Sequence, residues 1–385
     1  MPFPLYLLAL AVFAMGTSEF MLAGLLPDLA GDLGVPVGTA ALLTPAFAVG
    51  MAVGAPLMAV LVRGRSGRAG LLTFVLAFAA AHVLGAVTSG FPVLLATRVV
   101  AALANAGFLA LALTTAAGLV PADRKGRALA VLLSGTTVAM VAGVPGGALL
   151  GALFGWRAAF WAVALLCLPA AAGLLTSVPA GPARRDAPAR PALRAELARS
   201  ARPRLLLVML LGALVNAATF AGLTFLAPVV TGPAGLGELW VPVALVLFGA
   251  GSFAGVTVAG RLSDRRPGLV VAYGGPLLLA GWPALALLAE RPAALLVLVF
   301  AQGALSFALG STLITRVLYE AAGAPTLAGS CATAALNAGA AGGPVVAAAT
   351  LGADGTGLGP LWASALLVLA ALVVAWPARG VLRGA

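Results

Sequence analysis

Long apolar runs, each long enough to cross a bilayer, account for most of the 385 residues of this chain. A membrane-spanning helix needs about 20 mostly apolar residues. Twelve such runs begin near Pro4, Gly38, Ala69, Phe91, Ala128, Arg157, Arg204, Glu238, Gly268, Pro292, Pro325 and Gly359. Only 9% of the residues are charged and 62% are hydrophobic, too few charges to cover a water-soluble globule. We therefore predict an all-α integral membrane protein with twelve transmembrane helices.

The basic residues alternate between the two sides that these runs define. Of the 22 Lys and Arg residues, 19 fall in the loops after even-numbered runs or in the C-terminal tail. The loops after odd-numbered runs hold only Arg157 and Arg291, and Arg98 lies inside the fourth run. Because cytoplasmic loops are enriched in Lys and Arg, we predict a multi-pass protein of the cell (inner or plasma) membrane with both termini in the cytoplasm. The net charge of +11 is then a sign of topology, and we expect no nucleic-acid partner.

The chain divides into two similar halves around its longest polar stretch. Residues 178–203, SVPAGPARRDAPARPALRAELARSAR, predict a basic cytoplasmic linker between six-helix bundles at 1–177 and 204–385. Landmarks recur about 200 residues apart: Gly50, Gly54 and Arg63 as Gly251, Gly255 and Asp264, Phe91-Pro92 as Arg291-Pro292, and Pro145 as Pro344. Two pseudo-symmetric six-helix bundles are typical of secondary transporters, whose substrate site lies between the halves.

The sequence lacks the residues that several kinds of chemistry require. No phosphate-binding G-x-x-x-x-G-K-S/T motif occurs, and the only lysine, Lys125, lies in the loop PADRKGR. Cys167 and Cys331 lack the spacing of a disulfide or metal site. His82 has no Cys or carboxylate at ligand spacing, which favours a packed or hydrogen-bonded structural role. Since no nucleophile, metal or cofactor constellation is present, we expect a protein that is not an enzyme and needs no cofactor or metal.

Two ionisable residues, Glu19 and Arg98, lie clearly inside apolar runs. A charge at the bilayer centre costs about 2.5–3.5 kcal/mol on insertion scales, so each is a functional-site hypothesis. At ~1.5 Å per residue both lie about 10 Å below the outer surface, where they are able to meet. We interpret Glu19 as a protonatable coupling residue that is ionised when opened to water or approached by Arg98. A static structural ion pair is the alternative.

Other polar residues on the central runs fall at helical spacing. The pairs are Arg98 with Asn105, Asn216 with Phe220, Gln302 with Ser306, and Thr333 with Asn337. Residues four or seven apart share one helix face. The candidate substrate contacts are therefore Asn105, Asn216, Phe220, Gln302, Ser306 and Asn337. Phe220 beside the Asn216 amide suits a neutral, partly aromatic ligand, and interhelical hydrogen bonding is the alternative for the polar members.

Glycines recur at four-residue spacing, as in Gly50 with Gly54, Gly143 with Gly147, and Gly251 with Gly255. This spacing puts bare backbone on one helix face and predicts close helix packing. The same smooth faces allow helices to slide or tilt in a conformational cycle.

Two segments resemble the twelve-span drug:H+ antiporter group of the major facilitator superfamily. Residues 143–161, GVPGGALLGALFGWRAAFW, are similar to that group's antiporter motif and its Gly-Trp-Arg-x-x-Phe turn. Residues 16–35, GTSEFMLAGLLPDLAGDLGV, resemble the opening of its bacterial efflux branch. The resemblance implies the fold of that superfamily and a role for Arg98 in proton coupling. It also implies motif and gating roles for Gly54, Gly143, Pro145, Gly146 and Gly147.

The signature loop between the second and third runs departs from the family pattern. The family expects an acidic residue followed by basic ones, but Arg63 stands at the acidic position and Gly64 follows it. The counterpart after the eighth run, GRLSDRR at 260–266, keeps the acid as Asp264, followed by Arg265. The gating latch that the resemblance implies is therefore expected at Asp264 and Arg265.

Within that group, three segments resemble the chloramphenicol exporters of actinobacteria: GTSEFMLAGLLPDLAGDL, RVVAALANAGFLALAL and LSFALGSTLITRVLYEAAGAPTLAGSCATAALN. The resemblance implies proton-coupled efflux of a neutral amphipathic antibiotic, chloramphenicol first, by alternating access. The expected partners are this small-molecule drug, protons and the lipid bilayer, and we expect a monomer. The alternatives are an exporter of sugars or nucleosides with the same fold, an uncoupled facilitator, and a membrane sensor, for which the loops are too short to form a soluble domain.

Overall fold

The chain is helical throughout the residues that the computed structural model describes, which are 2–62, 67–121, 125–177, 202–263, 267–321, 328–351 and 357–376. The first half contains α1 (Phe3–Phe20), the 3₁₀ turn η1 (Met21–Gly24), α2 (Leu26–Leu33), α3 (Val37–Ala40), α4 (Leu43–Leu61), α5 (Gly67–Val87), α6 (Phe91–Gly118), α7 (Lys125–Val138), the π-helical turn η3 (Ala139–Gly143), α8 (Val144–Phe154) and α9 (Trp156–Ser177). The second half contains α11 (Pro203–Thr224), α12 (Leu226–Thr231), α13 (Trp240–Ser263), α14 (Pro267–Leu287), α15 (Pro292–Glu320), α16 (Ala328–Ala349) and α17 (Gly359–Ala375).

The predicted number of membrane spans agrees with these helices. Ten helical segments in the described ranges are long and apolar enough to cross a membrane. Two shorter apolar helices, Ala272–Leu287 and Gly359–Ala375, accompany them. The prediction of an all-α membrane protein with about twelve spans is confirmed.

Prolines mark where several of these helices begin. α6, α11 and α15 each carry a proline in the first helical turn, after a residue with extended backbone at Gly90, Arg202 and Arg291. Proline suits this position because its missing N–H would have no intrahelical acceptor and its φ is already helical. The same local rule therefore starts these three helices.

The helical elements repeat along the chain as the landmarks in the sequence predict. α1 ends at Phe20 and α11 ends at Thr224, and in both halves a short helix follows the break. A proline lies in each of these short helices, Pro27 in α2 and Pro228 in α12. The next pair of landmarks, Phe91-Pro92 and Arg291-Pro292, begins α6 and α15. The two halves thus share a similar order of helices, offset by about 200 residues.

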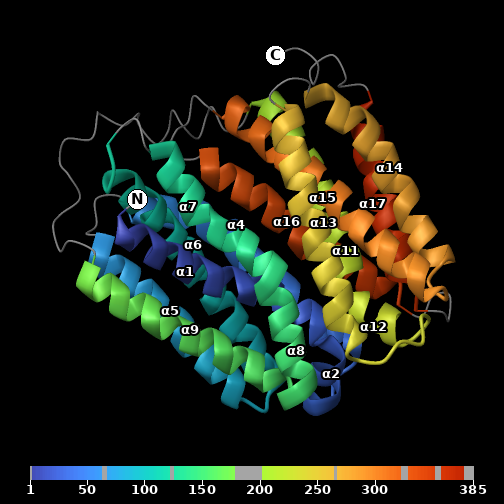
Figure 1. Cartoon of the computed structure of the whole chain (residues 1–385), viewed down its shortest axis with the longest axis horizontal. Coiled ribbons are helices and arrows are strands. Elements are labelled where there is room, and N and C mark those ends of the chain that lie inside the picture. The colour runs from blue at the N-terminus through green and yellow to red at the C-terminus, as the bar shows by residue number, and fades with distance from the viewer. Residues whose placement is uncertain are drawn as a thin grey trace.

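Figure 1 shows the helices gathered into two bundles side by side. Helices α1, α4, α5, α6, α7 and α9 share one apolar core, and α11 together with α13 to α17 builds the other. The bundles meet where α4 packs against α16 and α8 packs against α13, and Val144 and Ala148 of α8 join the second core. The boundaries 1–177 and 204–385 remain a prediction, because 178–201 lie outside the described residues.

One end of the molecule joins the two halves more closely, and we call it the α2 end. There α2 contacts α12, as the lower part of Figure 1 also shows. Residues of α2 and α3 form a shared apolar cluster with residues of α11, α16 and α17, including Leu26, Phe225 and Ala347. The two bundles are therefore sealed together by apolar contacts at this end.

The fifth span is not a continuous α-helix. α7 leads into the π-helical turn η3, and α8 resumes at Val144 with Pro145 in its first turn. Proline cannot donate a backbone hydrogen bond, and its ring displaces the carbonyl four residues earlier. A π turn is one way to absorb that displacement within a helix. The proline of the antiporter-like segment thus sits at an irregularity in the helix.

The glycine spacing predicted close helix contacts, and the second bundle contains them. A Cβ atom added to Gly251 or Gly255 of α13 would collide with the carbonyl oxygens of Phe300 and Ala304 on α15. Only glycine permits this approach of two helix backbones. The packing interpretation of this pair is confirmed.

Candidate functional site

A group of polar residues lies at the end of α1, just before the helix breaks. Thr17 and Ser18 are buried, and Glu19, the next residue, is half-buried. Successive side chains on a helix point about 100° apart. Ser18 and Glu19 therefore face different directions from one turn of α1.

Arg98 of α6 is buried, with 1% of its surface exposed. Its Nη1 donates to Ser18 Oγ over 2.7 Å and its Nη2 donates to the Ser18 carbonyl oxygen over 2.9 Å. The guanidinium group lies 4.5 Å from the centre of the Phe47 ring of α4, a cation–π arrangement. Neutral oxygens and an aromatic face thus surround a cationic side chain inside the first bundle.

Glu19 and Arg98 lie near each other, but the described part of the chain shows no ion pair between them. The two groups are close enough to interact electrostatically. The hydrogen bonds of Arg98 nevertheless go to Ser18, the neighbour of Glu19. The depth estimate predicted that the end of α1 lies beside α6. It did not identify Ser18 as the residue that contacts Arg98. The role of Glu19 in coupling stays a prediction.

His82 of α5 extends the polar group on its other side. Its Nε2 lies 2.6 Å from Ser18 Oγ, and its Nδ1 lies 2.8 Å from the Phe78 carbonyl oxygen. The imidazole ring also packs between the rings of Phe78 and Phe160. The expectation of a hydrogen-bonded histidine is met, and its partner is Ser18, which sequence spacing did not reveal.

The two halves touch through a pair of aromatic rings. The Phe20 ring at the end of α1 and the Phe220 ring of α11 have centroids 5.7 Å apart and are tilted by 37°. Ala48 of α4 and Ala340 of α16 pack around them. In this structure Phe220 contacts Phe20 of the other half, and its predicted contact with a substrate stays a prediction.

The predicted asparagines occupy two kinds of position. Asn216 Nδ2 of α11 donates to the Leu336 carbonyl oxygen of α16 over 2.6 Å, an interhelical bond. Asn337 Nδ2 donates within α16 to the Thr333 carbonyl oxygen, and its Oδ1 is buried with no hydrogen-bond partner in the described part of the chain. Asn105 is buried in α6. That these three residues contact a substrate stays a prediction.

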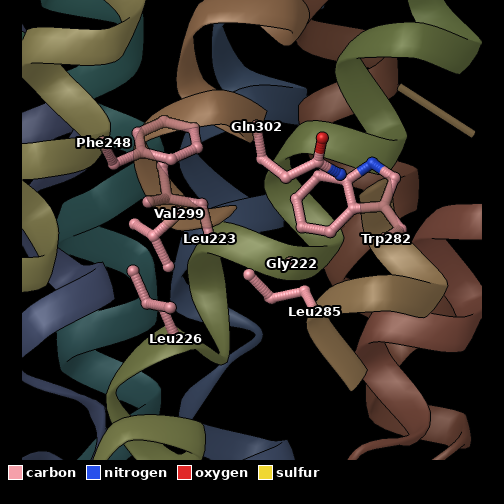
Figure 2. Close-up of a pocket in the computed structure, with 8 residues that line it drawn as sticks. All are labelled: Gly222, Leu223, Leu226, Phe248, Trp282, Leu285, Val299 and Gln302. Carbon is pink, nitrogen blue, oxygen red and sulfur yellow. The ribbon is translucent and has the colours of Figure 1, made fainter. Parts of the chain in front are cut away.

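Gln302 and Ser306 of α15 lie inside the second bundle. Gln302 Nε2 donates to the Leu278 carbonyl oxygen of α14 over 3.4 Å. Figure 2 shows its amide beside the Trp282 indole, at the edge of a small pocket. Gln302 Oε1, Trp282 Nε1 and Ser306 Oγ have no hydrogen-bond partner among the described residues. The role of Gln302 and Ser306 as substrate contacts stays a prediction. In this state the Gln302 amide packs against α14.

The antiporter-like segment packs directly on α1. A Cβ at Gly143 would collide with Thr17, and one at Gly147 would lie 3.2 Å from Met21 Cβ. Pro145 is buried, whereas Gly146 has no atom within 4 Å of the position that its Cβ would take. The segment therefore holds the fifth span against the turn of α1 that carries Ser18 and Glu19.

Of the other motif residues, the structure describes Gly54. Gly54 of α4 faces Leu103 and Ala106 of α6. Asp264 and Arg265, like Arg63, lie outside the described residues, so the latch stays a prediction.

Outside the membrane-spanning segments, Asp32 ties three loops together at the α2 end. Arg157 forms an ion pair with Asp32, and Trp156 Nε1 donates to Asp32 Oδ2 over 3.0 Å. Arg157 also donates to the Thr88 carbonyl oxygen over 3.1 Å and lies over the Trp156 ring. The hydrogen bonds from Arg157 and Trp156 hold the pKa of the Asp32 carboxyl below its ordinary value. The Gly-Trp-Arg turn of the sequence thus joins the loops that follow the first, third and fifth spans.

Comparison with known proteins agrees with this architecture. The chain is 74% identical over 382 residues to a chloramphenicol resistance protein of Streptomyces lividans, a match that covers 99% of this chain and 97% of that one. It is 33% identical over 382 residues to the inner membrane transport protein YdhP of Escherichia coli K12, covering 98% and 96% of the two chains.

A solved structure has the same fold. It is the crystal structure of a bacterial homologue of the human lysosomal transporter Spinster in an inward-facing, unoccupied conformation, with a TM-score of 0.75 and 18% identity over 97% of this chain and 94% of the other. The Major Facilitator Superfamily pattern matches residues 8–344. This chain, a multi-pass membrane protein, therefore belongs to the Major Facilitator Superfamily.

Proposed function

We propose that this chain exports chloramphenicol from the cell and that the proton gradient drives the export. The observation that carries the substrate is the 74% identity, over nearly the whole chain, to a protein named for chloramphenicol resistance. Chloramphenicol is a neutral molecule with an aromatic ring. Phe220 and Asn216, on the helix that meets α1 between the halves, offer stacking and hydrogen bonding to such a ligand.

Coupling to protons is supported by the charge buried in the first bundle. A buried cation in a membrane protein is costly and marks a functional site. Arg98 is held by neutral groups next to Glu19, so a carboxylate formed at Glu19 would find a cation nearby. In our mechanism Glu19 takes up a proton from outside, which removes this attraction and favours return of the empty carrier. Release of the proton inside restores the attraction and readies the carrier for the drug.

The energetics suit uphill export. Exchange of one neutral drug molecule for one proton moves one positive charge inward. Each charge contributes ~2.3 kcal/mol per 100 mV of membrane potential, in addition to the pH gradient. The protein would then be sensitive to the potential as well as to pH.

The distribution of basic residues supports the orientation that we propose. With both termini and the basic loops in the cytoplasm, the α2 end faces outward. The apolar cluster that joins the halves there would close the outer side in this state. We propose that the monomer is the transporting unit, because each chain contains both halves.

The test is accumulation of labelled chloramphenicol in drug-sensitive cells that express the chain. The wild type should lower accumulation, and either a protonophore or the Glu19→Gln variant should restore it. A matched Glu238→Gln variant, which changes a carboxyl outside the spans, should behave like the wild type. Uphill export that persists with Glu19→Gln would refute the coupling role.

The same assay distinguishes the alternatives. An uncoupled facilitator would equilibrate the drug and ignore the protonophore. An exporter of sugars or nucleosides would leave chloramphenicol accumulation at the level of empty cells. In that case, competition with labelled sugars and nucleosides would identify the substrate class.

A further inference from the structure

We infer that His82 is a positioning residue for proton coupling, and that it acts on Arg98 through the Ser18 hydroxyl. This inference rests on the proposed proton-driven function. It concerns a buried titratable side chain that the mechanism above does not use. Three helices, α1, α5 and α6, each contribute one member of this chain of hydrogen bonds, which we call the Ser18 relay: His82, Ser18 and Arg98.

With a neutral imidazole, the donors and acceptors of the Ser18 relay allow one arrangement. A charged imidazole is disfavoured here, because it would face the buried Arg98 guanidinium across one hydroxyl. The Phe78 carbonyl oxygen only accepts, so His82 Nδ1 carries the hydrogen and the neutral ring has a free lone pair on Nε2. Arg98 Nη1 only donates, so Ser18 Oγ accepts from it, and the Ser18 hydroxyl hydrogen is directed to His82 Nε2 over 2.6 Å. His82 thus fixes the orientation of the hydroxyl that receives Arg98.

The Ser18 relay also fixes Arg98 relative to Glu19. The Ser18 carbonyl oxygen accepts a second bond from Arg98, so the guanidinium group is held at the backbone directly before Glu19. Arg98 Nε is buried and has no hydrogen-bond partner in the described part of the chain. One donor of the cation therefore stays available for a further acceptor, and a carboxylate is the strongest one.

The other half of the molecule shows that the fold itself does not require an imidazole and a guanidinium at these positions. At the offset of 201 residues that relates Pro27 to Pro228, Thr219 stands in place of Ser18, and its hydroxyl donates within its own helix to the Val215 carbonyl oxygen. At the offset of 200 that relates Pro92 to Pro292, Trp282 stands in place of His82 and Leu298 in place of Arg98. Trp282 Nε1 has no hydrogen-bond partner within the described residues, and its ring packs on Gly222. The equivalent helices thus pack without a His–Ser–Arg network, which favours a functional role for the Ser18 relay in the first half.

Two substitutions at His82 separate positioning from packing. Glutamine places an amide oxygen where Nε2 lies and can accept from Ser18. Asparagine is shorter, so its amide reaches the Nδ1 position and can donate to Phe78, but it leaves the Ser18 hydroxyl without an acceptor. Both variants keep a polar amide of similar volume in the same pocket, and Ser18→Ala removes the bridge itself.

The experiment compares two activities of purified protein in liposomes. Exchange of labelled for unlabelled chloramphenicol without a gradient reports binding and carrier movement, and uptake driven by an imposed pH gradient reports coupling. We expect His82→Gln to keep gradient-driven uptake near that of the wild type. His82→Asn and Ser18→Ala should lower it about tenfold, the effect of losing one hydrogen bond to a charged group, with exchange retained. The double variant should be no worse than Ser18→Ala alone, since both remove one linkage.

Two results would overturn the inference while leaving the proposed function intact. One is a wild type that couples to protons beside a His82→Asn variant that couples equally well. The other is a His82→Gln variant that loses coupling as completely as His82→Asn, which would mean that an acceptor for the Ser18 hydroxyl is not what coupling requires. A wild type without gradient-driven uptake would instead overturn the proposed function and this inference together. If His82→Asn does not fold, Ser18→Ala decides alone, because coupling near that of the wild type would refute the relay.

Discussion

Gly143→Ala should disturb the contact between the fifth span and α1. The new Cβ would lie 3.0 Å from Thr17 Cβ and would overlap Thr17 Oγ1. Carbon atoms in good contact are about 3.5–4.0 Å apart, so the two helices must separate by about 0.5–1 Å. Thr17 cannot easily turn away, because its hydroxyl donates to the Phe13 carbonyl oxygen over 2.8 Å.

The magnitude follows from a matched control in the same segment. Forcing extra volume into a packed contact costs about 1–3 kcal/mol. Alanine is a better helix former than glycine by about 1 kcal/mol, and this gain is common to Gly143→Ala and Gly146→Ala. Gly146 has open space at its Cβ position. The difference in unfolding free energy between the two variants, about 1–3 kcal/mol, therefore isolates the collision.

The assay is reversible unfolding of the purified protein by SDS in mixed micelles, together with gradient-driven uptake. Gly143→Ala should be less stable than Gly146→Ala and should lose uptake, because Thr17 directly precedes Ser18 and Glu19. Adding Thr17→Ala to Gly143→Ala should recover part of the lost stability and part of the lost uptake, since it removes the overlapping oxygen. Equal stability and uptake of the two glycine variants would refute the packing argument.

Two further predictions concern the contacts of the loops and of the two halves. The ion pair of Asp32 with Arg157 should stabilise the protein above the ordinary pKa of an aspartate and lose its effect as the pH falls through the lowered pKa of Asp32. Asp32→Asn should lower the unfolding temperature at pH 7 and flatten its dependence on acid pH, and an unchanged profile would contradict this. The ring pair Phe20–Phe220 should contribute about 0.5–1.5 kcal/mol beyond area burial. A double-mutant cycle with Phe20→Leu and Phe220→Leu measures this coupling, and additive effects would show that the rings do not interact.

The sequence predicted the features that depend on one helix at a time. Apolar length located the spans, proline located helix starts such as Pro292, and residue counting placed Glu19 and Arg98 at a similar depth. The repeat paired Phe91-Pro92 with Arg291-Pro292, and both pairs begin a long helix. Each of these follows from distances along the chain, which a sequence contains directly.

The features that were missed depend on how helices are rotated against each other. Ser18 and His82 are 64 residues apart, and nothing in their spacing indicates that their side chains meet. The spacing of Gln302 left substrate contact and interhelical bonding both open, and it did not indicate that the amide would bond to α14. The rotation of a span is set by packing, for example by which glycine faces a neighbour, and an almost uniformly apolar helix gives no polar side from which to read it.

The contact between Phe20 and Phe220 also marks where the two pseudo-symmetric halves face each other. Each half contributes one ring from the helix that begins it, so the boundary between the halves passes between the two rings. A ligand lodged there would meet nearly the same aromatic wall from both directions. What breaks the equivalence is the second layer, where His82 and Arg98 stand on one side and Trp282 and Leu298 on the other. The centre between the halves thus has a charged flank in the first bundle and a neutral flank in the second.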